Sequence, residues 1–137
     1  MKILLITDQH FGVRNDNQVF IEKYQEFYSE TVLPFIDKNK IEHIICLGDV
    51  FDKRKSINFL SLDAARKMWF DPLRDRGITM DTLIGNHDIY YKNTLKVNAL
   101  DHLLGEYENI NVINDAQHLE YDLSLIHISE PTRRNSI

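Results

Sequence analysis

The hydrophobic positions of this chain fall into short continuous runs, separated by longer segments with helical spacing. The continuous runs are Lys2–Thr7, His43–Leu47 and Thr79–Ile84, and each is typical of a strand that is covered on both faces of a sheet. Over residues 17–39, and again after Ser56 or Asn58, apolar residues recur every three or four positions, which predicts two helices. Strands that alternate with helices predict an α/β fold, in which parallel strands are joined by right-handed helical crossovers.

Two prolines and a glycine refine the predicted helices. Pro34 lies late in the first helical pattern and is a candidate position for a kink. Asp71-Pro72 predicts that the second pattern restarts, with Asp71 as the N-cap and Pro72 at the first helical position, and Gly77 is a typical stop. The remaining predicted elements are a short helix around Ala99–Tyr107 and weaker strands at Asn111–Ile113 and His118–Tyr121.

The composition indicates what class of protein this is and in which compartment it lies. The chain has 137 residues, of which 43% are hydrophobic and 27% charged, as expected for one small soluble domain, and no apolar window is long enough to cross a bilayer. The apolar N-terminal run is interpreted as a buried strand and not as a signal peptide, because it lacks a small-residue cleavage site and leads into Asp8 and His10. The single cysteine, Cys46, excludes an internal disulfide and predicts a small core residue in a reduced, cytoplasmic protein.

The net charge of −5 limits how the chain could meet a nucleic acid. It argues against a protein that holds nucleic acid through bulk positive charge. The charge is compatible with an enzyme that binds phosphate groups through bound cations, because divalent metals reverse the sign of the local field.

A polar cluster follows each of the three apolar runs. The clusters are Asp8-Gln9-His10, Gly48-Asp49-Val50-Phe51-Asp52 and Gly85-Asn86-His87-Asp88. In a parallel sheet all three fall at the carboxyl edge, where open α/β folds bind their ligands. Successive clusters are separated by about one strand–helix–strand unit, so we expect them to converge in space.

These residue types suit a site for two divalent metal ions. Two ions held roughly 3.5–4 Å apart can bind phosphodiester oxygens, lower the pKa of a bridging water and neutralise charge as the bond breaks. Such a pair needs a carboxylate that bridges both ions, for which Asp49 is the candidate. Asp8 and His10 would serve the first ion, and Asn86 the second, through its amide oxygen. Each cluster alone could be an ordinary turn or capped loop, and it is their joint occurrence at strand ends that indicates a metal site.

The clusters resemble the first three motifs of the calcineurin-like metallophosphoesterases, here DQH, GDVFD and GNHD. Within that superfamily, HFG after the first Asp, GDVFDKRK and LIGNHDIYYKN resemble the SbcD-type DNA nucleases of repair and recombination, including those of T-even phages. The resemblance covers about residues 1–122. It implies the layered α/β fold of that superfamily, of which this chain would hold the N-terminal part, cut before the later strands.

The resemblance also implies a role for each motif residue. The implied metal ligands are Asp8, His10, Asp49 and Asn86. His87 would donate a proton to the departing sugar oxygen or steady it, and Asp88 would fix the orientation of an imidazole. Asp52 would orient His10 or the DNA, or cap the following loop. The two implied ions are manganese, although the residue types alone do not choose between Mn, Mg and Fe.

Residues beside the motifs are candidates for DNA contacts. Arg14, Lys53, Arg54 and Lys55 flank the first two motifs and could contact phosphates, or they could be ordinary solvated charges. After the third motif, Tyr91 and Lys92 could stack on or steer a strand end, or a tyrosine could pack against the sheet.

The chain departs from the family pattern after its third motif. The full pattern continues with a lone His and a Gly-His-x-His, and His102, His118 and His127 do not have that context. Residues 123–137 begin with LSLIHISEPTR, which looks like the translated end sequence of transposase-based sequencing libraries. The alternative is a genuine strand with a polar tail. We expect residues 1–122 to be the N-terminal part of a metallophosphoesterase nuclease domain, residues 123–137 to be a non-native tail, and this chain to bind metal poorly.

The resemblance implies a parent protein that is a metal-dependent DNA exonuclease or endonuclease. An SbcD-type subunit would form a homodimer, work with an SbcC-type coiled-coil ATPase and lie in the cytoplasm, that of the host cell if a phage encodes it. One alternative is another phosphoesterase on the same fold: a phosphomonoesterase, a protein phosphatase or a cyclic-nucleotide phosphodiesterase. The other is a non-catalytic scaffold subunit, against which the intact motif residues argue.

Overall fold

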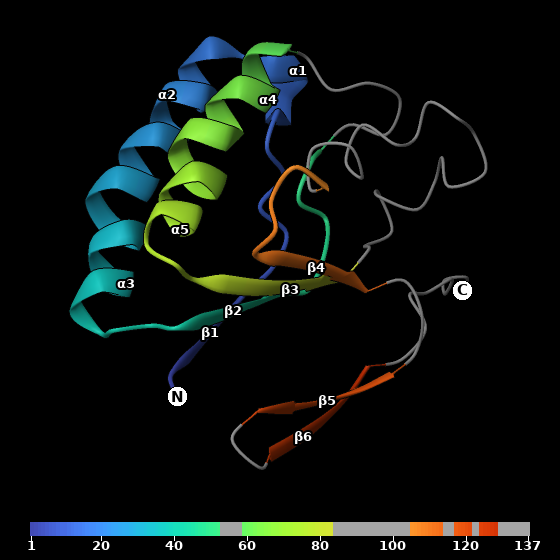
Figure 1. The fold of residues 1–137 in the computed structure, drawn as a ribbon. Coiled ribbons are helices and arrows are strands. Elements are labelled where there is room, and N and C mark those ends of the chain that lie inside the picture. Colours follow the sequence, from blue (N-terminus) through green and yellow to red (C-terminus); the bar gives the residue numbers. More distant parts are fainter. Residues whose placement is uncertain (53–58, 84–104, 114–116, 122–123, 129–137) are drawn as a thin grey trace.

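The structure is a computed structural model that describes residues 1–52, 59–83, 105–113, 117–121 and 124–128 (Figure 1). Its strands are β1 (Ile3–Ile6), β2 (His43–Cys46), β3 (Thr79–Leu83), β4 (Ile110–Ile113), β5 (Gln117–Tyr121) and β6 (Ser124–Ile128). Its α-helices are α1 (Val13–Asp16), α2 (Gln18–Phe27), α3 (Leu33–Lys38), α4 (Phe59–Ala65) and α5 (Asp71–Asp75). Two π-helical turns, η1 (Tyr28–Val32) and η2 (Arg66–Phe70), connect helices.

A parallel sheet forms the centre of the fold. Its four strands have the order β1-β2-β3-β4, and each pairs in parallel with the next. The predicted α/β fold with a parallel sheet is therefore confirmed, and the strands predicted near residues 2–7, 43–47, 79–84, 111–113 and 118–121 are all present. The helices lie together over one face of this sheet (Figure 1).

The core lies between the sheet and these helices. The strands contribute Ile44 and Met80, and the helices contribute Ile36, Trp69 and Leu73, all at most 2% exposed. Burying a side chain of this size stabilises the fold by about 1.5–3 kcal/mol. The prediction that Cys46 is a core residue is confirmed.

The first predicted helix is continuous through Pro34. α2 leads into η1 and then into α3, with Pro34 as the second residue of α3. The Leu33 N–H donates to the Tyr28 carbonyl five residues earlier, as a π-helical turn requires. A proline ring would collide with the carbonyl four residues before it in a regular α-helix. The wider turn just before Pro34 gives the ring room, and so the helix goes on.

The second helix repeats this arrangement, and the predicted restart at Asp71 is wrong. α4 continues through η2 into α5, and both Phe70 and Asp71 have helical backbone angles. A π-helical turn again precedes the proline, Pro72, so no new N-cap is needed. The Asp71 carboxylate instead accepts a hydrogen bond of 2.6 Å from the Tyr107 hydroxyl. Gly77, with φ 71°, follows the end of α5, and the predicted stop is confirmed.

The face of the sheet that points away from the helices carries a polar network. His43 on β2 bonds through Nε2 to Asp81 on β3 at 2.8 Å and through Nδ1 to Thr79 at 2.6 Å. Asp81 also accepts from the Asn111 amide on β4, at 2.9 Å, and from the Tyr121 hydroxyl on β5. This single carboxylate thus links four strands.

β5 and β6 pair in an antiparallel hairpin, which lies on that side of the sheet (Figure 1). The origin of residues 123–137 stays a prediction. The predicted helix at Ala99–Tyr107 falls largely outside the described residues. Within the part of the chain that the structure describes, no helix combines the length and the apolar character needed to cross a membrane.

Candidate metal centre

The loops that follow β1 and β2 run side by side past the carboxyl edge of the sheet. The Asp8 N–H donates to the Gly48 carbonyl at 3.0 Å, and the His10 N–H donates to the Asp49 carbonyl at 3.0 Å. The Phe11 N–H donates to the Val50 carbonyl at 2.8 Å. These bonds extend the pairing of the two strands, so the first two polar clusters are fixed relative to each other.

Asp8, His10 and Asp49, which we call the Asp–His cluster, meet at this edge. Each of the three residues offers one ligand atom, and these atoms all lie within 4.8 Å of one another. The structure therefore brings together three of the residues that were predicted as metal ligands. Their role as ligands stays a prediction.

All three residues of the Asp–His cluster have left-handed backbone conformations. The φ angles are 54° for Asp8, 51° for His10 and 54° for Asp49, and Gly48 precedes Asp49 with φ 111°. This conformation is uncommon for residues other than glycine, although Asp and His adopt it more readily than most. It persists only where surrounding contacts determine the backbone, and such residues gather at functional sites.

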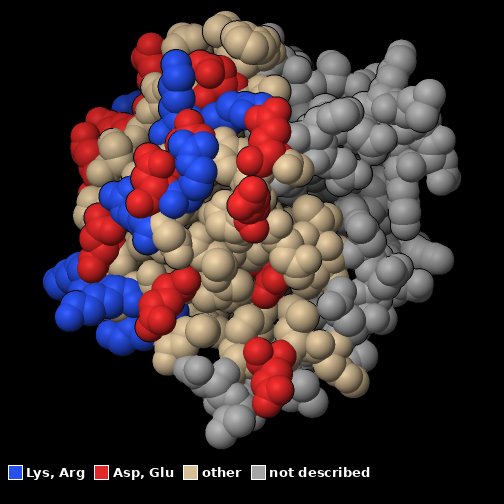
Figure 2. All heavy atoms as spheres, viewed as in Figure 1, with Lys and Arg blue, Asp and Glu red and all other residues tan. Residues whose placement is uncertain are grey.

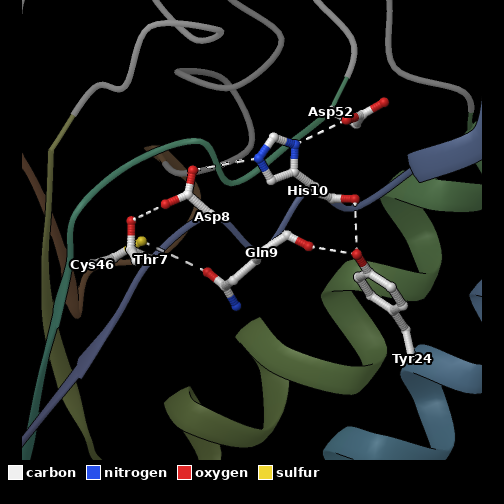
Figure 3. Close-up of polar contacts among 7 residues, drawn as sticks. All are labelled: Thr7, Asp8, Gln9, His10, Tyr24, Cys46 and Asp52. Atoms are coloured by element: carbon white, nitrogen blue, oxygen red, sulfur yellow. Dashed lines mark hydrogen bonds and ion pairs between the residues drawn. The ribbon is translucent and has the colours of Figure 1, made fainter.

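The His10 ring lies between two carboxylates (Figure 3). Its Nδ1 is 2.9 Å from Oδ1 of Asp52, and its Nε2 is 3.4 Å from Oδ1 of Asp8. When Nδ1–H donates to Asp52, Nε2 carries its lone pair on the side of Asp8, as a metal-binding imidazole requires. Of the three roles predicted for Asp52, the geometry suits the orientation of His10.

The charges in the site shift two pKa values. The Thr7 hydroxyl, which donates to Oδ2 of Asp8 at 2.7 Å, is the main reason that the pKa of Asp8 is lowered. Burial of the His10 ring by itself lowers the pKa of His10, but the hydrogen bonds to Asp52 and Asp8 outweigh it and the pKa is raised. Asp8 is thus held as a carboxylate, while His10 binds a proton more readily than a free imidazole.

The donor set of the Asp–His cluster fits a divalent cation. Two carboxylates beside each other repel, and a bound cation would turn that repulsion into attraction. Carboxylate oxygens with one imidazole nitrogen are a mixed set that suits Mn, Fe or Mg. The residues present therefore fit at least one divalent ion.

The third predicted cluster and most candidate DNA contacts lie outside the described residues. These are Asn86, His87 and Asp88, with Lys53, Arg54, Lys55, Tyr91 and Lys92. Arg14 is described and exposed, and its guanidinium lies 5.7 Å from the centre of the Phe20 ring. Figure 2 shows Lys and Arg interspersed with Asp and Glu over the helices on this face, so the described residues seen there form no separate basic patch.

The residues that hold the first loop were not identified from the sequence. Gln9, between Asp8 and His10, is buried, and its carbonyl accepts from the Tyr24 hydroxyl at 2.7 Å. Tyr28 and Cys46 bind the Gln9 side chain. The two tyrosines follow the apolar spacing of a helix, and Gln9 is a single polar residue in a motif. Their contact joins segments far apart in the chain, and nothing in the local pattern indicates it.

Known proteins resemble this chain over most of its length. The family described as calcineurin-like phosphoesterase matches residues 1–131, which is most of the chain. This chain belongs to the calcineurin-like phosphoesterase family. It is 37% identical over 126 residues to "Exonuclease subunit 1" of Enterobacteria phage T4, which covers 92% of this chain and 37% of that protein. It is 29% identical over 119 residues to "Putative phosphoesterase 078R" of Invertebrate iridescent virus 3, covering 83% of this chain and 31% of that protein.

The predicted family resemblance is thereby confirmed, and membership implies that the fold binds a divalent metal, for which the Asp–His cluster is the candidate site. The chain spans about a third of the length of the curated relatives that it matches, 37% and 31%. The activity, substrates and partners of the whole protein are therefore matters for proposal.

Proposed function

We propose that the parent protein is a two-metal phosphodiesterase that cuts DNA, as an exonuclease or endonuclease subunit in recombination or repair. The observation that carries the proposal is the Asp–His cluster, in which two carboxylates and an oriented imidazole meet at the carboxyl edge of the sheet. The similarity to a phage protein named as an exonuclease subunit supports DNA as the substrate class.

The proposed roles follow from the three sequence motifs. Asp8 and His10 would hold one ion, Asp49 would be shared with a second, and Asn86 would contribute its amide oxygen to the second. Bound divalent ions, with manganese as our choice, would supply an activated water and would neutralise the charge of the phosphodiester. His87 protonates or steadies the departing sugar oxygen, and Asp88 orients an imidazole.

Bound cations also reconcile the acidic chain with an anionic substrate. The net charge is −5, and basic residues are mixed with acidic ones over the helices (Figure 2). Attraction for the phosphates would come from the metal ions, with local help from the candidate DNA contacts Arg14, Lys53, Arg54, Lys55, Tyr91 and Lys92.

The proposed partners are those of an SbcD-type subunit. They are DNA, a second copy of the parent protein and an SbcC-type coiled-coil ATPase. The proposed location is the cytoplasm, that of the host cell if the gene is a phage gene. Size-exclusion chromatography of the parent protein, alone and with its candidate ATPase, tests the two protein partners.

The test of the reaction uses the reading frame that continues beyond Asp122. We expect that frame to encode a His and a Gly-His-x-His, and its product to degrade end-labelled duplex DNA with Mn²⁺ but not with a chelator. His87→Ala should abolish cleavage and keep Mn²⁺ bound, because His87 contacts the leaving group and not the metal. Asp49→Asn should lose both DNA cleavage and Mn²⁺ binding.

Three results would contradict this proposal. Hydrolysis of p-nitrophenyl phosphate without cleavage of DNA would favour the alternative of a phosphomonoesterase. Loss of Mn²⁺ in His87→Ala would overturn the role given to His87. A parent protein that binds Mn²⁺ and hydrolyses neither ester would favour the scaffold.

A further inference from the structure

Gln9 lies between two residues of the Asp–His cluster, but its side chain points away from them. It is only 6% exposed, whereas the Asp8 side chain is 53% exposed. The side chains of Asp8 and His10 lie on one side of the loop and that of Gln9 on the other (Figure 3). Gln9 is thus well placed to fix the loop from behind.

Both ends of the Gln9 amide are bound in the core. Its Nε2 donates to the Tyr28 hydroxyl at 2.8 Å, and its Oε1 accepts from the Cys46 thiol at 3.6 Å. Tyr28, on η1, is 3% exposed, and Cys46, the last residue of β2, is 0% exposed. Burial raises the pKa of Tyr28, so its hydroxyl stays protonated. The amide thereby connects the loop after β1 to a helix and to the neighbouring strand.

The backbone of Gln9 is bound as well. The Tyr24 hydroxyl donates to the Gln9 carbonyl at 2.7 Å and lies 3.3 Å from the His10 carbonyl (Figure 3). Tyr24 and Tyr28 stand one helical turn apart, and both reach the same loop. A Gln9 amide that stayed buried without these partners would raise the free energy of the folded state. Loop conformations that break these hydrogen bonds are therefore disfavoured.

Left-handed backbone angles at Asp8 and His10 need such support, because each costs free energy that the surroundings must offset. We propose that Gln9, held by Tyr28 and Cys46, is the positioning residue of this metal centre. It keeps Asp8 and His10 in the one backbone conformation that presents both side chains to the same ion. The proposal rests on the proposed function, in which these two residues bind a divalent metal.

The test compares two tyrosine hydroxyls in the parent protein, the product of the reading frame that continues beyond Asp122. Tyr28→Phe removes the partner of the Gln9 amide, and Tyr107→Phe is the matched control. Tyr107 is also 3% exposed, and its hydroxyl donates to Asp71, at 2.6 Å. Mn²⁺ affinity is measured from the electron paramagnetic resonance signal of free Mn²⁺, and stability is measured separately by urea unfolding without metal.

We expect both substitutions to lower stability by similar amounts and only Tyr28→Phe to weaken Mn²⁺ binding. Loss of outer-shell partners typically weakens metal binding by about 10–100-fold, and we expect about tenfold for Tyr28→Phe. Gln9→Met, which keeps the volume of the side chain without its amide, should weaken binding at least as much. A purely structural role would move the urea midpoint in these variants and leave the Mn²⁺ affinity unchanged.

The outcomes separate this proposal from the one on which it rests. If the unaltered parent protein binds Mn²⁺ and both Tyr28→Phe and Gln9→Met bind it equally well, the positioning role is overturned and the metal site stands. If Tyr107→Phe weakens binding as much as Tyr28→Phe, the effect is general and the positioning role is again overturned. If the unaltered parent protein does not bind Mn²⁺, the proposed metal site fails, and the positioning role fails with it.

Discussion

Asp52 fixes the orientation of the half-buried His10 ring. Its Oδ1 lies 2.9 Å from Nδ1 of His10, which leaves Nε2 on the side of Asp8. Asp52→Ala should let the ring rotate and change tautomer, and we expect the Mn²⁺ affinity of the chain to fall by about 10–100-fold. Isothermal titration calorimetry with Mn²⁺ measures the change.

The control for Asp52→Ala is an aspartate with a partner away from the site. Asp37→Ala breaks the ion pair with Arg76, whose Nε is 2.8 Å from Oδ1 of Asp37. That surface pair should matter little for stability and leave Mn²⁺ binding unchanged. Equal Mn²⁺ affinity in the two variants would show that Asp52 does not act through His10.

The raised pKa of His10 predicts opposite pH effects on folding and on metal binding. Burial alone lowers this pKa, and the bonds to Asp52 and Asp8 outweigh it. In the metal-free chain, the protonated ring therefore stabilises the fold fully below its unfolded pKa of about 6.5. That stabilisation is lost as the pH rises through the higher folded value. Mn²⁺ needs the neutral ring, so its affinity should fall as the pH falls through the same window.

Two titrations measure this pair of effects. Mn²⁺ affinity is followed from about pH 8 to about pH 6, and urea unfolding of the metal-free chain is followed over the same range. In His10→Gln the folding contribution should disappear, because the amide does not titrate. Identical pH profiles of stability in the unaltered chain and in His10→Gln would refute the assignment.

At the residue scale, the sequence predicts the convergence of the candidate ligands better than the contacts that support them. Asp8, His10 and Asp49 were expected to converge because polar residues that follow adjacent parallel strands share one edge, and the structure places them together. Gln9 and Tyr28 are separated along the chain, and their bond depends on how η1 packs behind the loop. No local pattern encodes that packing.

At the scale of elements, one cap decides where α2 begins. The Asn17 side chain accepts a hydrogen bond of 2.8 Å from the Val19 N–H, which would otherwise lack a partner at the helix start. Asn17→Ala should lower the free energy of unfolding by about 1 kcal/mol, and Asn17→Asp, which keeps the acceptor, should lower it far less. Urea unfolding curves measure both, and equal losses would exclude a capping role.

The strands and helices were predictable from the sequence to different degrees. The strands and the extents of both helical regions were predictable, because buried runs and three-to-four spacing follow directly from burial. The two π-helical turns were not. Pro34 and Pro72 were interpreted as a kink and as a restart, since a proline in a regular helix has those effects. Both prolines instead follow a wider turn, a choice that depends on the packing of the whole helix.

At the scale of the whole molecule, Asp81 joins the sheet to the hairpin. His43, Asn111 and Tyr121 all bond to its carboxylate, from three different strands. Burial, with the bond to Asp81, raises the pKa of Tyr121, so its hydroxyl remains a donor. Because the carboxylate is the common acceptor, its removal would take this partner at once from the buried His43, the half-buried Tyr121 and the exposed Asn111.

Asp81→Ala should therefore lower the free energy of unfolding by about 3 kcal/mol or more, whereas Tyr121→Phe should cost about 1 kcal/mol. Asp81→Asn keeps the shape but turns one acceptor into a donor, so it should rescue little. The double variant of Tyr121→Phe with Asp81→Ala decides whether the hairpin is held through this carboxylate. If it is, the two losses overlap and the double variant is barely less stable than Asp81→Ala, since the tyrosine has already lost its acceptor. Fully additive losses would mean that Tyr121 stabilises the fold without Asp81, and that the hairpin is held on the sheet by other contacts.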